Sequence, residues 1–459
     1  MRILLTVLIL AAALPGAQGW RAGVAKVDIT PGEPIWLSGF ANRTRPSEGV
    51  FERIWVKALA LEDENGSLAV VVTSDLQGFS RAMSERIALA AGTRYKLARE
   101  RLLLNASHNH SAPVTNDVLP LYYGLPPAQQ AAVNRYTEQL PDKVLEAIGA
   151  AISDLRPASL CFGQGLAGFA VNRRRSRPGW RHLPAAVDQD VPVLAVRDPA
   201  GGALRAVVFG YACHTTTLAG YQISGDWAGT AQTAIEGRHP GAVALFLNGC
   251  GADSNPLPRY HGTDPALSSY SVELAQSYGR ILGAAVDLVL HGQMRTVTGP
   301  VRCAYAVAAL PLQRAPAPEA LAAAAQSRDA LRSRSARYLL GRLERDGKLP
   351  SEWPYPIQVW RFGDSLSLVA LAGEPVVDYS LRFKRDYGWE NTWVSGYNTD
   401  LTAYIPSLRV LKEGGYEGTE GVWEYGIPAP FGWAAEEVIA DVVADLFRRC
   451  SPEKPSSPM

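Results

Sequence analysis

Short apolar runs that end in small polar clusters recur along this chain, and they restrict its fold more than any other feature. The run at residues 101–104 leads into the polar segment 105–113, and the run at 204–211 leads into 212–217. In layered α/β proteins, polar residues at the carboxyl ends of strands gather at one edge of a sheet. The pattern therefore predicts a site assembled from distant segments. The clusters contain His108 and His110, His214, Asp253 and Ser254, Glu374, and Tyr404.

The spacing of apolar and turn residues predicts an α/β protein. We expect a single large layered domain with mixed central sheets flanked by helices and an active site at strand ends. One hairpin joins residues 54–61 to 67–73 through an Asn-Gly turn, and another joins 358–362 to 365–371. The apolar run at 241–247 is expected to be a central strand buried on both faces. No internal repeat or long linker divides the 459 residues, which favours one domain.

Apolar residues at helical spacing predict several long helices. These cover residues 83–95, 126–155, 266–290, 319–345 and 433–449. Pro141 is expected to interrupt the second helix, because proline lacks a backbone N–H and crowds the preceding turn. The fourth helix is rich in alanine and arginine with a polar outer face, so we expect it to form a peripheral insertion.

The first residues have the layout of a secretory signal peptide. Arg2 precedes an apolar run at 3–14, and small residues follow at 17–19. This run is shorter than the ~20 residues that span a bilayer, so we expect residues 1–19 to be removed and the protein to be secreted or periplasmic. An uncleaved N-terminal anchor stays open as an alternative. At the other end, the Pro/Ser-rich residues 451–459 are expected to be a disordered tail.

The composition excludes several classes of protein. With 45 basic and 44 acidic residues, the chain lacks the charge that captures nucleic acid. The arginine-rich segment 173–177 is a local exception, and it is either a solvated loop or a contact for an anionic substrate or lipid headgroup. Five scattered cysteines exclude a disulfide scaffold and a CxxC zinc site. Cys213 and Cys250 remain a possible pair.

The residue types in the polar clusters suggest metal chemistry. His108 and His110 are two residues apart, so in an extended segment both rings point to the same side. With His214 and a carboxylate such as Glu374, they offer the ligands that zinc prefers and leave a position for water. Tyr404 is either a further ligand or a donor to a developing oxyanion.

Simpler interpretations exist for the same residues. Glu374 could face the dipole of a following helix, which contributes ~0.5 kcal/mol, and Tyr404 could be a core tyrosine with a satisfied hydroxyl. Ser254 lacks a Gly-x-Ser-x-Gly elbow, which disfavours a conventional serine hydrolase. The remaining histidines lie in loop or helix-end contexts that favour a surface role. They are His182, His239, His261 and His291.

The ordered polar segments resemble the neutral/alkaline, non-lysosomal ceramidase family in its N-terminal catalytic domain. The similarity extends from residues 22–31 to 416–418. Its specificity lies in the order of the motifs, since none is specific alone. The segments that carry it are 107–111, 213–216, 373–375, 398–406 and 415–417. Longer family members continue into an immunoglobulin-like domain, which we do not expect in this short member.

This resemblance implies one Zn²⁺ held by His108, His214, Glu374 and Tyr404. It implies that His110 handles protons, and that zinc-bound water attacks an amide carbonyl to release a fatty acid and an amine. Ser254 aligns with a serine in the family's small-residue loop. The resemblance thereby implies that Ser254 is a further catalytic residue. The loop itself differs, because the family's Gly-Asp-Val-Ser-Pro-Asn is Gly-Ala-Asp-Ser-Asn-Pro here.

The leading hypothesis is therefore an exported zinc-dependent amidohydrolase that cleaves an N-acyl, ceramide-like lipid. Its catalytic domain would cover residues 20–450, with no nucleic-acid partner and with peripheral membrane contact as a possibility. One alternative is a metal-dependent esterase or another hydrolase of a polar substrate. A second alternative is a non-catalytic protein that binds zinc or a ligand. The sequence leaves the oligomeric state and the acyl length open.

Overall fold

The computed structural model describes residues 19–451, except residues 177–178, 180, 183–185, 200–201 and 260–264. The expected signal peptide, apart from Gly19, and residues 452–459 of the expected tail lie outside the described residues. No described helix has the length and the apolar character that crossing a bilayer requires.

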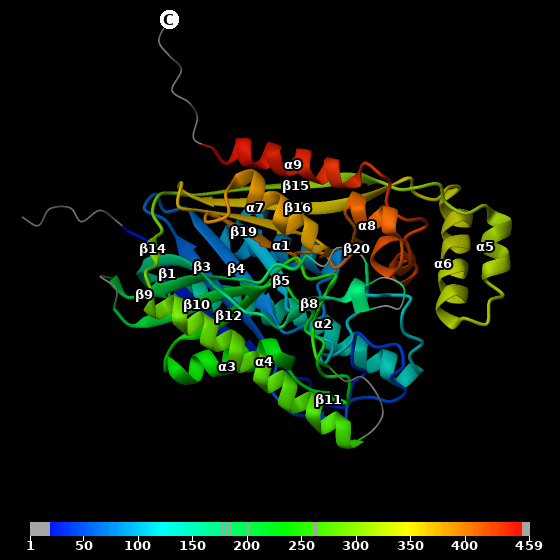
Figure 1. Cartoon of the computed structure of the whole chain (residues 1–459), viewed down its shortest axis with the longest axis horizontal. Helices are drawn as coiled ribbons and strands as arrows, with labels where there is room; N and C mark the ends of the chain where they lie inside the picture. Colours follow the sequence, from blue (N-terminus) through cyan, green and yellow to red (C-terminus); the bar gives the residue numbers. More distant parts are fainter. Residues whose placement is uncertain are drawn as a thin grey trace, which may run out of the picture.

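Three mixed sheets form the body of the molecule (Figure 1). The first has the strand order β5-β4-β3-β1-β6. Its strands are β1 (Arg21–Asp28), β3 (Trp55–Glu62), β4 (Leu68–Ser74), β5 (Leu102–Ala106) and β6 (Arg156–Pro157). β3 and β4 form the first expected hairpin, while β4 and β5 are parallel.

The second sheet has the order β12-β10-β9-β7-β14. Its strands are β7 (Ser159–Leu166), β9 (Asp190–Arg197), β10 (Leu204–Tyr211), β12 (Val243–Asn248) and β14 (Arg295–Thr296). β12 is buried as expected, but it ends this sheet's hydrogen-bonded order and is not central. It is nevertheless shielded from solvent because β4 and β5 of the first sheet lie against it.

The third sheet has the order β15-β16-β17-β19. Its strands are β15 (Val301–Pro311), β16 (Glu352–Phe362), β17 (Leu366–Leu371) and β19 (Thr392–Ser395). β16 and β17 form the second expected hairpin. Three short pairs complete the strands of the described residues. They are β2 (Gly49–Val50) with β11 (Gln222–Ile223), β8 (Ala170–Asn172) with β13 (Ser254–Pro256), and β18 (Glu374–Pro375) with β20 (Tyr404–Ile405).

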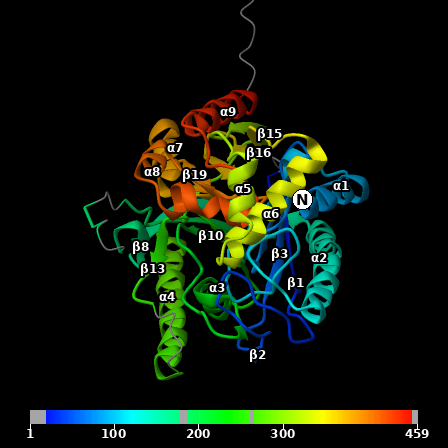
Figure 2. The ribbon, with the colours of Figure 1, turned by 90° about the vertical axis from the view of Figure 1, so that its right-hand side faces the viewer.

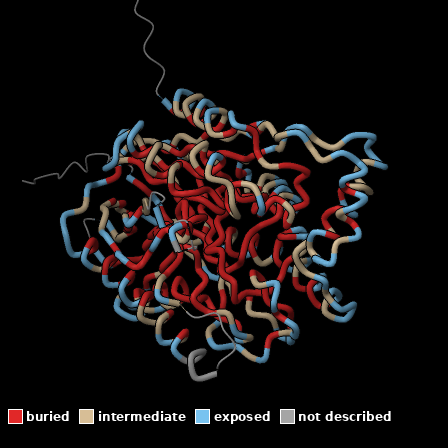
Figure 3. Tube along the Cα trace, turned by 45° about the vertical axis from the view of Figure 1, so that its right-hand side comes forward, coloured by how far each residue is buried: buried red, intermediate tan, exposed pale blue. Residues whose placement is uncertain are grey.

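Helices cover the outer faces of the three sheets, and the inner faces share one apolar core (Figures 2 and 3). The shared core joins Leu103, Leu245 and Trp360, one from each sheet. A fully buried apolar side chain of this size contributes roughly 1.5–3 kcal/mol. The first sheet packs on α1 (Arg81–Tyr95) and α2 (Pro127–Ser153), the second on α3 (Asp226–Arg238) and α4 (Pro265–His291), and the third on α7 (Val377–Tyr387) and α9 (Ala435–Arg449).

Each of the three sheets contains one parallel pair, and these pairs bring strand ends together. The pairs are β4 with β5, β10 with β12, and β17 with β19. The side chain of Asn105 links their carboxyl ends. Its Nδ2 donates to Gly396 O at 2.8 Å and to Asn398 Oδ1 at 3.0 Å, while its Oδ1 accepts the Asn248 N–H at 3.0 Å. One buried amide therefore connects all three sheets beside the expected site.

Two helix predictions were wrong in detail. The single helix expected at 319–345 is a pair, α5 (Pro318–Ala324) and α6 (Ala330–Asp346), which projects from the body in Figure 1. The Asp329 carboxylate accepts the N–H groups of Leu331 and Arg332 and starts a new helix there. Pro141 was expected to interrupt a helix, yet α2 continues through it. Its buried ring is part of the packed face, which outweighs the lost hydrogen bond.

The five cysteines are free thiols in the structure. The possible pairing of Cys213 with Cys250 is therefore wrong, although both are fully buried next to the site segments. As buried thiols they act as small apolar groups in the core.

Candidate metal centre

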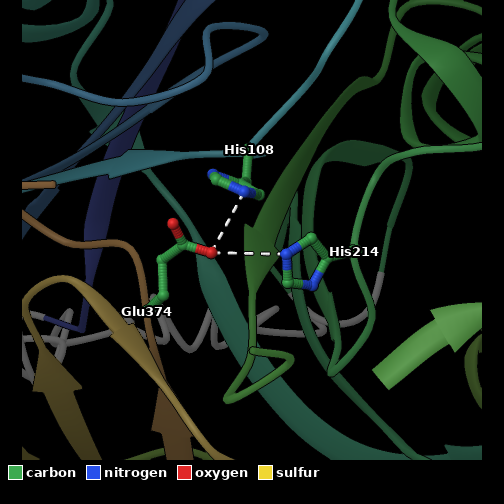
Figure 4. A group of neighbouring side chains, drawn as sticks. All are labelled: His108, His214 and Glu374. Carbon is green, nitrogen blue, oxygen red and sulfur yellow. Dashed lines mark ion pairs between the residues drawn. The ribbon is translucent and has the colours of Figure 1, made fainter. Parts of the chain in front are cut away.

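Three side chains of metal-ligand type meet at the convergent strand ends, and each follows a different sheet (Figure 4). His108 follows β5, His214 follows β10, and Glu374 lies in β18 just after β17. Glu374 Oε2 is 3.2 Å from His108 Nε2 and 3.3 Å from His214 Nε2. All three side chains are buried, and their ligand atoms lie within 4.8 Å of one another.

Main-chain carbonyls fix both histidine rings. His108 Nδ1 is 3.1 Å from Gln77 O, and His214 Nδ1 is 2.7 Å from Gly251 O. Since a carbonyl can only accept, each Nδ1 carries the proton and each Nε2 presents a lone pair. Burial, with the nearby Arg173 cation, lowers the pKa of His214 to about 3, so this imidazole is neutral.

The donor set fits a divalent metal such as zinc. Two imidazole lone pairs and a carboxylate oxygen face one another in a buried space, and these three groups repel unless a cation lies between them. The Tyr425 hydroxyl donates to the other carboxylate oxygen of Glu374, Oε1, and so directs Oε2 toward the histidines. Glu374 precedes α7 rather than starting it, so its main role is in this cluster.

His110 stands beside the cluster with its Nε2 3.2 Å from His108 Nε2. Its ring packs edge-on against Phe40, with 4.9 Å between the ring centroids. Gly39, at φ +88°, lets the chain pass so close that a Cβ there would overlap the His110 ring. Burial lowers the pKa of His110 well below its ordinary value, so the ring is neutral.

Tyr404 reaches the site through β20, which pairs in parallel with β18. In this register Tyr404 is the partner of Glu374. Its ring lies nearly parallel to that of His214, with 6.5 Å between centroids, and its hydroxyl is hydrogen-bonded to Arg173. Tyr404 is therefore a buried tyrosine with a bonded hydroxyl, and it also lies beside the cluster.

Asp253 and Ser254 lie next to His214, Asp253 just before β13 and Ser254 at its start. The Ser254 carbonyl accepts the His214 N–H at 3.0 Å, while its buried hydroxyl has no hydrogen-bond partner among the described residues. The Asp253 carboxylate accepts the Val377 N–H at 2.9 Å and the Asn172 side-chain amide at 3.0 Å. Asp253 thus joins the start of α7 to β8, and it supports the site without pointing into the cluster.

The sequence interpretation missed the roles of Arg173 and Tyr425. Arg173 Nη1 is 3.2 Å from His214 Nε2, and Arg174 is fully buried, whereas Arg175 is exposed. Of the described side chains in this segment, those of Arg173 and Arg174 are therefore not part of a solvated loop. Its charge density was a usable signal for Arg173. Tyr425 gave no local signal, because its partner Glu374 is 51 residues away.

Comparison with protein families agrees with this architecture. The model of the N-terminal region of neutral/alkaline non-lysosomal ceramidases matches residues 20–249, half of the chain. The chain belongs to this ceramidase family. The resemblance expected from the ordered motifs is confirmed.

Individual relatives match shorter stretches. The neutral ceramidase of Drosophila melanogaster is 28% identical over 100 residues, which cover 20% of this chain and 14% of the relative. Neutral ceramidase B of Dictyostelium discoideum is 25% identical over 231 residues, which cover 47% of this chain and 31% of the relative. The matched region is thus less than a third of the length of each of these relatives.

Solved structures confirm the fold. The neutral ceramidase of Pseudomonas aeruginosa superposes with a TM-score of 0.73 at 19% identity, covering 96% of this chain and 76% of the other. A ceramidase complexed with C2 gives a TM-score of 0.71 at 18% identity, covering 96% and 77%. At such identities the likeness establishes the layered α/β fold with mixed sheets.

Proposed function

We propose that this protein is an exported zinc-dependent amidohydrolase that cleaves the amide bond of an N-acyl, ceramide-like lipid. The observation that carries the proposal is the convergence of two histidine lone pairs and one carboxylate oxygen in a buried space. Membership of the ceramidase family supports the amide as the scissile bond. The proposed catalytic domain covers residues 20–450 and follows a cleaved signal peptide at 1–19.

His108, His214 and Glu374 would hold the zinc, with the Tyr404 hydroxyl as fourth ligand. When bound there, zinc supplies a Lewis acid and lowers the pKa of water to about 7. The protein's own groups would do the remaining work. His110, whose Nε2 lies 3.2 Å from Nε2 of the ligand His108, would be the proton-handling residue.

Arg173 would stabilise negative charge that develops on the amide oxygen, because its guanidinium already lies beside His214 and Tyr404. The unpartnered hydroxyl of Ser254 is available to a substrate oxygen or nitrogen, which supports its proposed catalytic role. The Arg173 guanidinium is held before substrate arrives, so it needs little reorganisation.

The proposed substrate is a lipid, and peripheral contact with a membrane is part of the proposal. The second of the similar solved structures is a ceramidase complexed with C2. The alternatives are a metal-dependent esterase, since the same cluster would also polarise an ester, and a protein that binds zinc or a ligand without catalysis.

A substrate panel on the purified, zinc-loaded protein tests these alternatives. We expect one zinc per chain and release of fatty acid from N-acyl sphingoid amides, with slower release from matched esters. Faster ester than amide cleavage would support the esterase. Stoichiometric zinc with no cleavage of either series would support the binding protein. His239 contacts Asp287 outside the site, so the His239→Ala variant is the control for substitution of a histidine.

A further inference from the structure

We propose that Glu417 is a positioning residue that holds the Arg173 guanidinium against His214 and Tyr404. Glu417 Oε1 accepts the Arg173 Nε–H at 2.7 Å. Because this bond uses the Nε side of the guanidinium, the terminal nitrogens are turned toward the site. Nη1 is the atom that lies 3.2 Å from His214 Nε2. The effect of this placement on catalysis rests on the proposed function. The contact between Glu417 and Arg173 does not.

Glu417 is itself held from behind. Its second oxygen, Oε2, accepts from Arg174 Nη1 at 2.7 Å. Arg174 is anchored in turn by Glu413 Oε2 at 3.0 Å and by the Gly414 carbonyl at 2.9 Å. Glu417 and Arg174 are both almost fully buried. Rotation of the carboxylate would break its short hydrogen bonds to both Arg173 and Arg174, so its position is strongly determined.

This ionic network joins the segments that carry the site. Arg409 contacts both Glu413 at 2.8 Å and Asp378 at 2.7 Å, and Asp378 lies in α7, directly after the Glu374 segment. The network thus runs from Arg173, through Glu413 at the end of α8 (Leu408–Glu413), to Asp378 in the first turn of α7, four residues after Glu374. The Arg173 backbone is held by its N–H bond to Asp253 O at 2.7 Å, and the buried charges fix the direction of its side chain.

An arginine side chain needs such support. Its long stem gives it many rotamers, and it is productive only in the one that faces the reacting atoms. Arg173 lies over two aromatic rings, 5.4 Å from the Tyr404 centroid and 5.7 Å from that of Tyr416. These contacts restrict its plane, and the Glu417 hydrogen bond selects its direction.

The network contains a matched control. Glu413 is also a partly buried carboxylate that pairs with arginines, but its contacts are to Arg174 and Arg409. Glu413→Gln and Glu417→Gln therefore each remove one negative charge from the same network. Only Glu417→Gln removes the direct hold on Arg173.

The experiment compares Glu417→Gln and Glu413→Gln in the zinc-loaded protein. We expect Glu417→Gln to lower kcat by about tenfold or more, with KM and zinc affinity in chelator competition changed by less than about threefold. Both variants should lower Tm by similar amounts, because each removes one charge from the network. Glu413→Gln should leave kcat within about twofold of the wild-type value. In an Arg173→Ala background, Glu417→Gln should have no further effect on kcat. Equal kcat losses in the two single variants, independent effects in the double variant, or loss of zinc would overturn the proposal.

A binding measurement separates this proposal from the proposed function. Octanoate supplies a carboxylate that the Arg173 guanidinium attracts, and its Kd can be measured by calorimetry without turnover. We expect Glu417→Gln to weaken octanoate binding by about tenfold and Glu413→Gln by less than about twofold. If the wild-type protein cleaves no amide, the proposed function fails while this difference can still hold. If Glu417→Gln does not fold, Glu417→Asp, which withdraws the carboxylate by one methylene, is judged by the same criteria.

Discussion

The two sides of the metal centre are held in place by different kinds of contact. On the histidine side, the main-chain carbonyls of Gln77 and Gly251 orient His108 and His214. The tyrosine side consists of Arg173, Glu374 and the tyrosines around them. There Arg173 is oriented by Glu417, and Glu374 is oriented by the Tyr425 hydroxyl. The first side therefore depends on the local path of two loops. The second depends on side chains that come from segments far apart in the sequence.

The two sides should respond to different kinds of mutation. A carbonyl acceptor remains whatever residue carries it, so the histidine rings tolerate changes in the neighbouring side chains. A side-chain partner can be removed by a single substitution. The histidine side should therefore be sensitive to changes of the ligands and of the backbone path, and the tyrosine side to changes of charge and protonation.

The largest expected effect comes from His214→Ala, because it removes a ligand atom itself. Zinc affinity and amide cleavage should both fall by more than about a hundredfold. His110→Ala removes no proposed ligand, so it should keep the zinc while losing rate. Metal analysis and kcat on the same preparations check both. Full zinc occupancy and turnover in His214→Ala would show that the histidine side is not the metal site.

A backbone change on the histidine side should have an intermediate effect. Gly39→Ala places a methyl group against the His110 ring at a φ of +88°, whereas Gly347→Ala has a φ of +70° and no atom within 4 Å of its new methyl. Both should lose about 1 kcal/mol of stability to the left-handed backbone. Only Gly39→Ala should also lower kcat, by about tenfold or more. Equal rates in the two variants would mean that the close packing of His110 is not required.

The smallest effect, a shift of stability with pH, tests the tyrosine side. The buried carboxyl of Glu424 accepts from the Tyr416 hydroxyl at 2.7 Å, and burial raises its pKa from 4.5 to about 8. The folded protein therefore keeps a proton that the unfolded chain releases. Its stabilising contribution is complete below pH 4.5 and is lost as the pH rises through about 8.

Glu424→Gln is neutral at every pH and removes this dependence. Its free energy of unfolding relative to wild type should therefore increase between pH 5 and pH 9 by about 2–4 kcal/mol. Denaturant titrations at the two pH values measure the difference. The exposed Glu420→Gln is the control and should show no such increase. If the difference in unfolding free energy between Glu424→Gln and wild type were the same at pH 5 and pH 9, Glu424 would not be protonated in the folded protein.

Much of the architecture could be predicted because its signals are local. The two hairpins have turn residues between apolar strands, and α1 has apolar residues at helical spacing. The break between α5 and α6 was missed because alanine and arginine favour a helix throughout, and only the Asp329 cap divides it. The central position expected for β12 was wrong because strong burial also arises where separate sheets face each other.

The sequence by itself determined the layered α/β fold, the strand-end polar clusters and the identity of His108, His214 and Glu374 as candidate ligands. The tertiary structure decided how the clusters meet, because each comes from a different sheet and only the parallel pairs, joined through Asn105, bring their ends together. It also decided the surroundings of Arg173. Side-chain periodicity is a local property of the chain, whereas a partner such as Glu417, 244 residues away, is chosen by packing and burial of charge.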